Sequence, residues 1–139
     1  MEPRPHPTIL LVDDHRAVRD ELAHLLEEDG MAVCGQAGGR VEALACAAEH
    51  LPDLALVDLS LDNDDGLALV ADLHKRGILV VVCSTYENPG YVQQALDLGA
   101  RAYVAKRDAG RALVRTLRDV LDGWVLVSPR AAGDLPNRY

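Results

Sequence analysis

Two short apolar runs of this chain lead directly into acidic residues. The run ILLV ends at Asp13 and Asp14, and the run LALV ends at Asp58. A short apolar run bounded by turn signals predicts a fully buried strand. In an open parallel sheet, ligands bind in the crevice outside the carboxyl ends of the strands. If the two runs form neighbouring strands, their carboxylates converge on one crevice, where they stay ionised only if a cation lies among them. Oxygen ligands of this kind indicate Mg²⁺.

Composition and charge exclude several classes of protein. The 139 residues suit one domain with a sizeable core, which must be built from Leu, Val, Ala and Ile because there is no Phe and one Trp. A net charge of −8 opposes binding of nucleic acid or an anionic membrane by this chain itself. No run predicts a membrane span or a signal peptide. The three cysteines are Cys34, Cys46 and Cys83, and none forms a CxxC pair. This pattern predicts free thiols in a reducing cytoplasm.

Strand candidates alternate with stretches of helical spacing. The predicted strands cover 9–13, 32–36, 54–58, 78–83 and 102–105. Helical faces are predicted by apolar residues that recur at helical spacing (i, i+3 or i+4, i+7 or i+8): Val18, Leu22, Leu25 and Leu26; Val41, Leu44, Ala45 and Ala48; Leu113, Leu117, Val120 and Leu121. Asn88 followed by Pro89 predicts a helix start, and Asp108 predicts the cap of the last helix.

Strict alternation of strands and helices predicts an α/β fold. The expected architecture is a doubly wound, five-stranded parallel sheet in the order 2-1-3-4-5 with five helices, as in flavodoxin-like proteins. This order puts the first and third strands side by side, which brings Asp13, Asp14 and Asp58 together.

Two more polar residues are expected at the same edge of the sheet. Ser84 ends the fourth apolar run and Lys106 follows the fifth. An acidic Mg²⁺ site with a hydroxyl and an ammonium group is suited to handling a phosphoryl group, because the metal and the lysine neutralise its oxygens. One carboxylate would then act as the nucleophile.

At this point the chain resembles a known family. The segments ILLVDDH, LALVDLSLDNDDG, VVVCST and RAYVAKRD are similar to the motifs of response-regulator receiver domains of two-component signalling. The spacing agrees: Gly66 lies eight residues after Asp58, and Tyr103 and Lys106 lie nineteen and twenty-two residues after Ser84. The resemblance implies a flexible N-terminal tail over 1–7, a receiver domain over 8–125, and a C-terminal tail or linker start over 126–139.

The resemblance also implies a role for each acidic residue. Asp58 would accept the phosphoryl group from the phosphohistidine of a histidine kinase. Asp14 would bind Mg²⁺ directly and Asp13 through water, with Asp58 and the backbone carbonyl of Ser60 completing the site. Such a domain is a switch and not an enzyme.

The remaining residues would respond to the phosphoryl group or control its loss. Ser84 would move toward it, Lys106 would pair with one of its oxygens, and Tyr103 would turn inward, which changes the surface of the fourth helix, fifth strand and fifth helix. Ser60 and Tyr86 would flank the attacking water, and the bulk of Tyr86 predicts slow self-dephosphorylation.

Some interpretations remain open. Thr85 competes with Ser84 for the hydroxyl role, and Tyr103 could simply pack in its strand. The acidic loop 62–65 either alters Mg²⁺ affinity or is a solvated turn. His15 lies beside the acids but has no histidine partner at ligand spacing.

Three functions are weighed. A haloacid-dehalogenase-type phosphatase also uses an aspartate nucleophile, but it needs a second acid two residues on, and His15 stands there. A degenerate receiver would only bind partners. The leading interpretation is a phosphorylatable receiver, for which homodimer formation is left open.

The C-terminal segment GWVLVSP resembles the exit from LuxR/NarL-type receivers, where a helix-turn-helix DNA-binding domain follows. We therefore expect either that such a domain was removed or that the receiver acts alone.

Overall fold

The computed structural model describes residues 6–59, 66–85, 88–108, 110–123 and 126–127. Its strands are β1 Thr8–Val12, β2 Ala32–Ala37, β3 Leu54–Val57, β4 Leu79–Ser84, β5 Ala102–Ala105 and β6 Leu126–Val127. Its helices are α1 Arg16–Glu28, α2 Arg40–His50, α3 Gly66–Lys75, α4 Pro89–Asp97 and α5 Arg111–Leu121, with a 3₁₀ turn at Lys106–Asp108. The alternation predicted from the sequence is confirmed, and the ends of the five predicted strands differ from the prediction by at most one residue.

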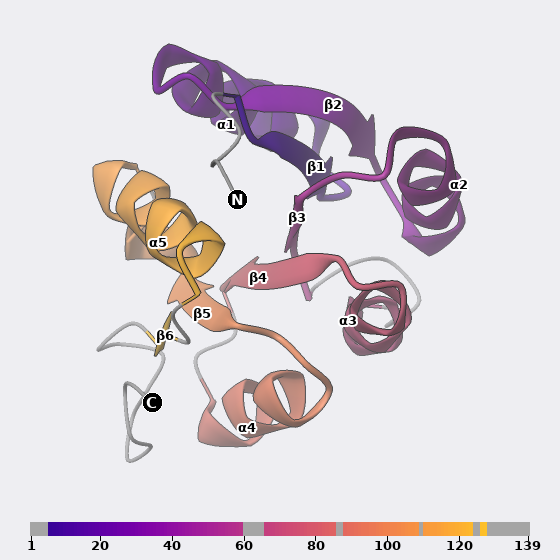
Figure 1. The fold of residues 1–139 in the computed structure, drawn as a ribbon. Helices are drawn as coiled ribbons and strands as arrows, with labels where there is room; N and C mark the ends of the chain where they lie inside the picture. Colours follow the sequence, from indigo (N-terminus) through magenta and orange to yellow (C-terminus); the bar gives the residue numbers. More distant parts are fainter. Residues whose placement is uncertain (1–5, 60–65, 86–87, 109, 124–125, 128–139) are drawn as a thin grey trace.

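All strands belong to one parallel sheet in the order β2-β1-β3-β4-β5-β6 (Figure 1). The predicted order 2-1-3-4-5 is therefore confirmed for the first five strands. The sheet has one strand more than predicted, because Leu126 and Val127 pair with Ala102 and Tyr103 of β5. These two residues fall in the segment expected to be a tail or linker, and a strand of two residues is too short for alternation to be recognised.

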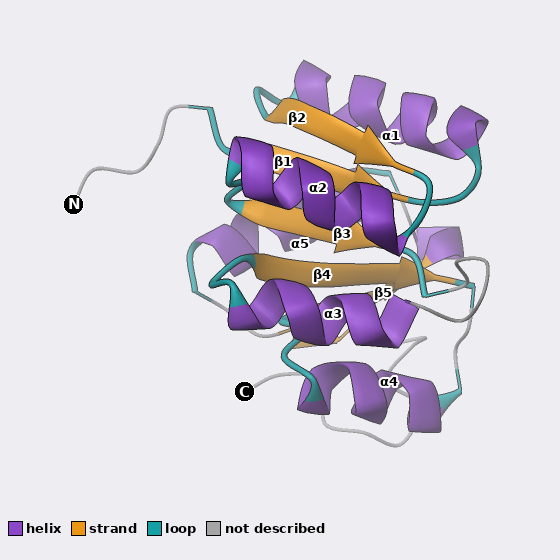
Figure 2. Ribbon diagram, turned by 90° about the vertical axis from the view of Figure 1, so that its right-hand side faces the viewer, coloured by secondary structure: helices purple, strands orange, loops and turns teal. Residues whose placement is uncertain are grey.

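The helices cover both faces of the sheet. Helices α2, α3 and α4 lie on one face and α1 and α5 on the other (Figures 1 and 2). Strand residues alternate between the two layers, so Leu10 and Val12 join one buried cluster while Ile9 and Leu11 join the other. A parallel sheet covered on both faces explains why the central strands are continuous apolar runs. No helix in the described ranges has the length and apolarity needed to cross a bilayer.

The buried face of α2 differs from the prediction. Val41 is 83% exposed, and Ala45 and Ala48 are also exposed, whereas Ala43 and Ala47 are buried. Small residues let this helix approach β2 closely, where a Cβ on Gly35 would lie only 3.3 Å from the Cys46 Sγ. Of the predicted face, Leu44 is partly buried against the core, as expected. The prediction is wrong for Val41, Ala45 and Ala48, because periodicity weights large residues and cannot detect a face built from alanine.

The other helix predictions have mixed outcomes. In α5 the predicted face is confirmed by buried Leu113, Leu117 and Val120, and in α1 Leu26 is buried. The Asn88 side chain accepts a hydrogen bond of 2.7 Å from the backbone N–H of Gly90, and Pro89 is the first residue of α4, as predicted. The cap prediction for Asp108 is wrong, because it ends the 3₁₀ turn and α5 begins after Gly110.

The two layers give a stability prediction. Leu117→Ala should lower the free energy of unfolding by about 2–5 kcal/mol, because it opens a cavity in the layer beneath α5. Val41→Ala should change it by less than about 0.5 kcal/mol, because the side chain is exposed. Urea unfolding followed by circular dichroism measures both. A large loss in Val41→Ala would contradict the observed orientation of α2.

Candidate functional site

The carboxyl ends of the central strands bring the predicted site residues together. Asp13 and Asp58 directly follow β1 and β3, and the Asp58 N–H donates a 2.9 Å hydrogen bond to the Val12 carbonyl. Ser84 is the last residue of β4 and lies in register with Ala105 of β5. Lys106 follows Ala105, so one edge of the sheet carries the predicted acids, hydroxyl and ammonium.

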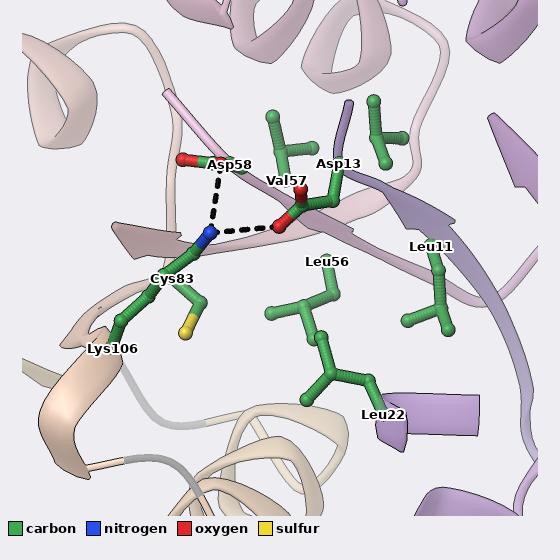
Figure 3. A pocket seen from close by; sticks show the side chains of 9 residues that line it. Leu11, Asp13, Leu22, Leu56, Val57, Asp58, Cys83 and Lys106 are labelled. Carbon is green, nitrogen blue, oxygen red and sulfur yellow. Dashed lines mark hydrogen bonds and ion pairs between the residues drawn. The ribbon is translucent and has the colours of Figure 1, made fainter. Parts of the chain in front are cut away.

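The Lys106 side chain bridges two of the carboxylates. Its Nζ lies 2.8 Å from Asp13 Oδ2 and 3.0 Å from Asp58 Oδ2 (Figure 3). Both aspartates are buried, and the lysine is 22% exposed. Charged hydrogen bonds are strong when water is largely excluded, so this ammonium fixes the relative positions of the two strand ends.

An apolar floor lies beneath this ion pair. The small cavity at the site is lined by Leu22, Leu56 and Cys83 as well as by the charged groups (Figure 3). Burial raises the pKa of the Cys83 thiol to about 12, so it is a neutral, apolar part of this floor. The floor keeps water away from the underside of the charges and strengthens their attraction.

The protonation states follow from this environment. Burial alone would raise the pKa of Asp13, but hydrogen bonds from Lys106 and from the His15 N–H outweigh it and hold that pKa below its ordinary value. Burial alone would lower the pKa of Lys106, but hydrogen bonds to Asp13 and Asp58 raise it. At neutral pH the site therefore holds a charged lysine against a charged Asp13.

The residues present fit a magnesium ion. The carboxylate of Asp14 contains a buried oxygen, Oδ1, that accepts no hydrogen bond from a described residue, although His15 Nδ1 lies 2.8 Å away. Ligand atoms of Asp13, Asp14 and His15 lie within 4.8 Å of one another. The His15 ring is largely exposed, and Mg²⁺ prefers oxygen, so the two aspartates are the fitting donors.

The predicted switch residues are both fully buried. Ser84 lies at the site edge of the sheet, whereas its competitor Thr85 is exposed. Tyr103 packs in the core layer shared with α2, α3 and α4, opposite Val82 in the β4–β5 register. The described structure therefore has the tyrosine in an inward, fully buried position.

Close packing explains why position 66 is a glycine. A Cβ on Gly66 would lie 2.6 Å from the Cα of Leu59, a distance that side chains do not tolerate. Glycine lets the first turn of α3 approach the residue that follows Asp58. Ser60, the acidic loop 62–65 and Tyr86 lie outside the described residues.

One contact at the site was not predicted from the sequence. The Arg19 guanidinium donates a 2.6 Å hydrogen bond from Nη1 to the backbone carbonyl of Asp13. The available signal was its place in the helix that follows the acid pair, one turn after His15. Arginine in a surface helix is too common for that signal to stand out.

Comparisons with known proteins agree with this geometry. Residues 9–118 match the family model described as "Response regulator receiver domain". The chain is 35% identical over 130 residues to the DNA-binding transcriptional activator DevR/DosR of Mycobacterium tuberculosis, covering 91% of this chain and 60% of that protein. It is 33% identical over 126 residues to the transcriptional regulatory protein UhpA of Salmonella typhimurium, covering 90% and 64%.

Solved structures are similar over most of the chain. A LuxR-family two-component response regulator from Aurantimonas superposes with a TM-score of 0.88 at 27% identity, covering 94% of this chain and 95% of that one. A CheY-like receiver domain protein from Methanospirillum hungatei has a TM-score of 0.78 at 30% identity, covering 84% and 94%. The matches favour a receiver over a haloacid-dehalogenase-type phosphatase. The chain spans about 60% of the length of the curated relatives it matches.

The lysine bridge predicts a pH-dependent contribution to stability. In metal-free buffer near pH 7, Lys106→Met should lower the free energy of unfolding by about 1.5–3 kcal/mol, because charged hydrogen bonds are lost. Because the pKa of Asp13 is lowered on folding, its stabilising contribution is full above the unfolded value and is lost as the pH falls through the folded value. Because the pKa of Lys106 is raised on folding, its contribution is full below the ordinary value of 10.5 and is lost as the pH rises through the higher folded value.

Urea unfolding should therefore show a penalty for Lys106→Met that is full at neutral pH and smaller at an acidic pH below 3.8, the ordinary pKa of aspartate. The control is Lys75→Met, since Lys75 is an exposed lysine of α3. A penalty of the same size at both pH values would mean that only packing was lost.

Proposed function

The chain belongs to the response regulator receiver domain family, and we propose that it accepts a phosphoryl group on Asp58 from the phosphohistidine of a histidine kinase. The observation that carries this proposal is the buried Asp58 carboxylate held by Lys106 beside a second acid, Asp13. Such a carboxylate is oriented by a cation and shielded from solvent, as a nucleophile requires.

The transfer forms one bond and breaks another. A carboxylate oxygen of Asp58 attacks the phosphorus, the P–N bond to the kinase histidine breaks, and the imidazole leaves with the electron pair. Lys106 then exchanges its contact with Asp58 for a phosphoryl oxygen while it keeps Asp13. One ammonium thus stabilises the carboxylate before transfer and the phosphoryl group afterwards.

Mg²⁺ is the cofactor of this proposal. Asp14, Asp13 and Asp58 would hold it, together with the backbone carbonyl of Ser60, and the bound ion would neutralise charge on the transferred group. The buried Asp14 Oδ1, which accepts no hydrogen bond from a described residue, supports this assignment. The chain would assist its own phosphorylation and dephosphorylation without turning over a separate substrate, and Tyr86 would slow the loss of the group.

The output would be a change of surface. Ser84 would move toward the phosphoryl group, and this movement would alter the face made by α4, β5 and α5. Tyr103 was expected to turn inward on activation; it is already buried, and we propose that this inward position is the one it keeps when Asp58 is phosphorylated. The similarity to DevR/DosR and UhpA supports control of transcription through a DNA-binding domain. The compartment would be the cytoplasm, where Cys34, Cys46 and Cys83 stay free.

Phosphorylation is tested with a small acyl phosphate and Mg²⁺. Intact-mass measurement should show one added phosphoryl group that is stable to acid and labile to base, and Asp58→Asn should gain none because its nucleophile is lost. The matched control is Asp97→Asn, which removes an exposed carboxylate of α4 and should be phosphorylated normally. The proposal fails if the parent gains no group or if Asp58→Asn still gains one.

The switch is tested by Ser84→Ala. This variant should still acquire the phosphoryl group, because Asp58 and Lys106 are unchanged, but its response should be weak because the hydroxyl contact is gone. Amide chemical shifts of α4 measure the response, and Thr85→Ala, which alters the exposed neighbour, is the control. If phosphorylation changes the α4 amide shifts as much in Ser84→Ala as in the parent chain, the assigned role of Ser84 is excluded.

A further inference from the structure

We propose that Arg19 is a positioning residue for the metal site, because its guanidinium holds the carbonyl of the peptide that joins Asp13 to Asp14. The inference rests on the proposed function, since it concerns the Mg²⁺ that the phosphoryl transfer requires. It adds a residue whose side chain binds neither the metal nor the phosphoryl group.

The guanidinium connects the ends of two strands. Arg19 lies in the first turns of α1 and is half-buried. Its Nη1 donates to the Asp13 carbonyl at 2.6 Å, and its Nε donates to Gln36 Oε1 of β2 at 3.2 Å. A Cβ on Gly38 would lie 3.3 Å from Nη1, so the group also packs against the segment that follows β2. The planar, forked donor set of arginine suits this double contact.

The contact of Arg19 with the Asp13 carbonyl completes the set of contacts that hold Asp13. The backbone N–H of Asp13 donates to the Ala37 carbonyl at 3.0 Å. One carboxylate oxygen accepts the His15 N–H at 2.9 Å, and the other accepts Lys106 at 2.8 Å. With Arg19 on the carbonyl, the residue is held through its backbone on both sides and through both side-chain oxygens.

The carbonyl matters because it belongs to the peptide that leads into Asp14. Rotation of that peptide would carry the Asp14 carboxylate with it, and Asp14 Oδ1 is the buried oxygen that accepts no hydrogen bond from a described residue. The exposed His15 ring, with Nδ1 at 2.8 Å, is the side chain that lies against this oxygen. Arg19 therefore orients the Asp14 carboxylate through its backbone. Contacts of this kind around metal ligands commonly change metal affinity by about 10–100-fold.

Charge and positioning predict opposite effects at this residue. A cation near the site repels Mg²⁺, so losing its charge alone would tighten binding slightly, as expected for a half-exposed group in salt. Losing the hydrogen bond to Asp13 would weaken binding instead. The sign of the change in affinity therefore distinguishes the two roles.

The experiment is a calorimetric titration of the full chain with Mg²⁺ alone. Arg19→Met keeps the aliphatic stem without a donor, and it should weaken Mg²⁺ binding by about tenfold. Arg19→Lys should recover most of the affinity, because an ammonium can still donate to the Asp13 carbonyl. Gln36→Ala should have a smaller effect than Arg19→Met, since it leaves that hydrogen bond in place.

Arg16→Met is the matched control. Arg16 is in the same helix, its side chain is 85% exposed, and its Nε lies 3.9 Å from Asp20 Oδ2. The substitution therefore removes one positive charge without removing a hydrogen bond to Asp13. It should leave Mg²⁺ affinity unchanged or slightly tighter. Urea unfolding of each variant, together with the amide shift of Asp14, checks that the folded structure persists.

Several results would overturn the inference. Equal or tighter Mg²⁺ binding by Arg19→Met would exclude the positioning role, and so would an equal weakening by Arg16→Met or a parent chain that binds no Mg²⁺. The proposed function has a separate readout, because a parent chain that binds Mg²⁺ but never acquires a phosphoryl group would refute it and leave the role of Arg19 standing.

Discussion

The ion pair of Lys106 with Asp13 and Asp58 is the interaction on which the rest of the site depends. Three strands, β1, β3 and β5, deliver these groups, and their register decides whether the 2.8 Å and 3.0 Å contacts form. Two buried carboxylates would repel each other without the ammonium between them. The same arrangement is easily changed by an added charge, because any new anion beside Asp58 competes for Lys106. A stabilising contact is in this way also a sensor of charge.

The parts of the site predicted from the sequence are those that follow strand ends. Asp13, Asp58 and Ser84 could be located because an apolar run fixes where a strand stops, and parallel strands stop at one edge. Lys106 could be added because it follows the fifth run. Arg19 could not, because its contact is made to a backbone carbonyl, which leaves no pattern of residue types along the chain.

The errors in the fold prediction have the same origin. In α2, the exposed Val41 carries a strong hydrophobic signal, while the buried Ala43 and Ala47 carry a weak one. What decides the orientation is the close approach of this helix to Gly35, a tertiary contact that spacing does not encode. The strand β6 is likewise defined by its partner, since Leu126 and Val127 are ordered by pairing with β5.

The shortness of β6 has a mechanical consequence for β5. In the ladder that the structure describes, β6 is paired with Ala102 and Tyr103, whereas β4 is paired along the whole of β5, including Val104 and Ala105. The beginning of β5 is thus hydrogen-bonded to a strand on both sides, and its end, which leads into Lys106, is hydrogen-bonded on one side. A strand paired in this way is fixed near Tyr103 and is easier to displace at the end next to the lysine. Displacement of the ammonium would be absorbed over Val104 and Ala105 without breaking the sheet.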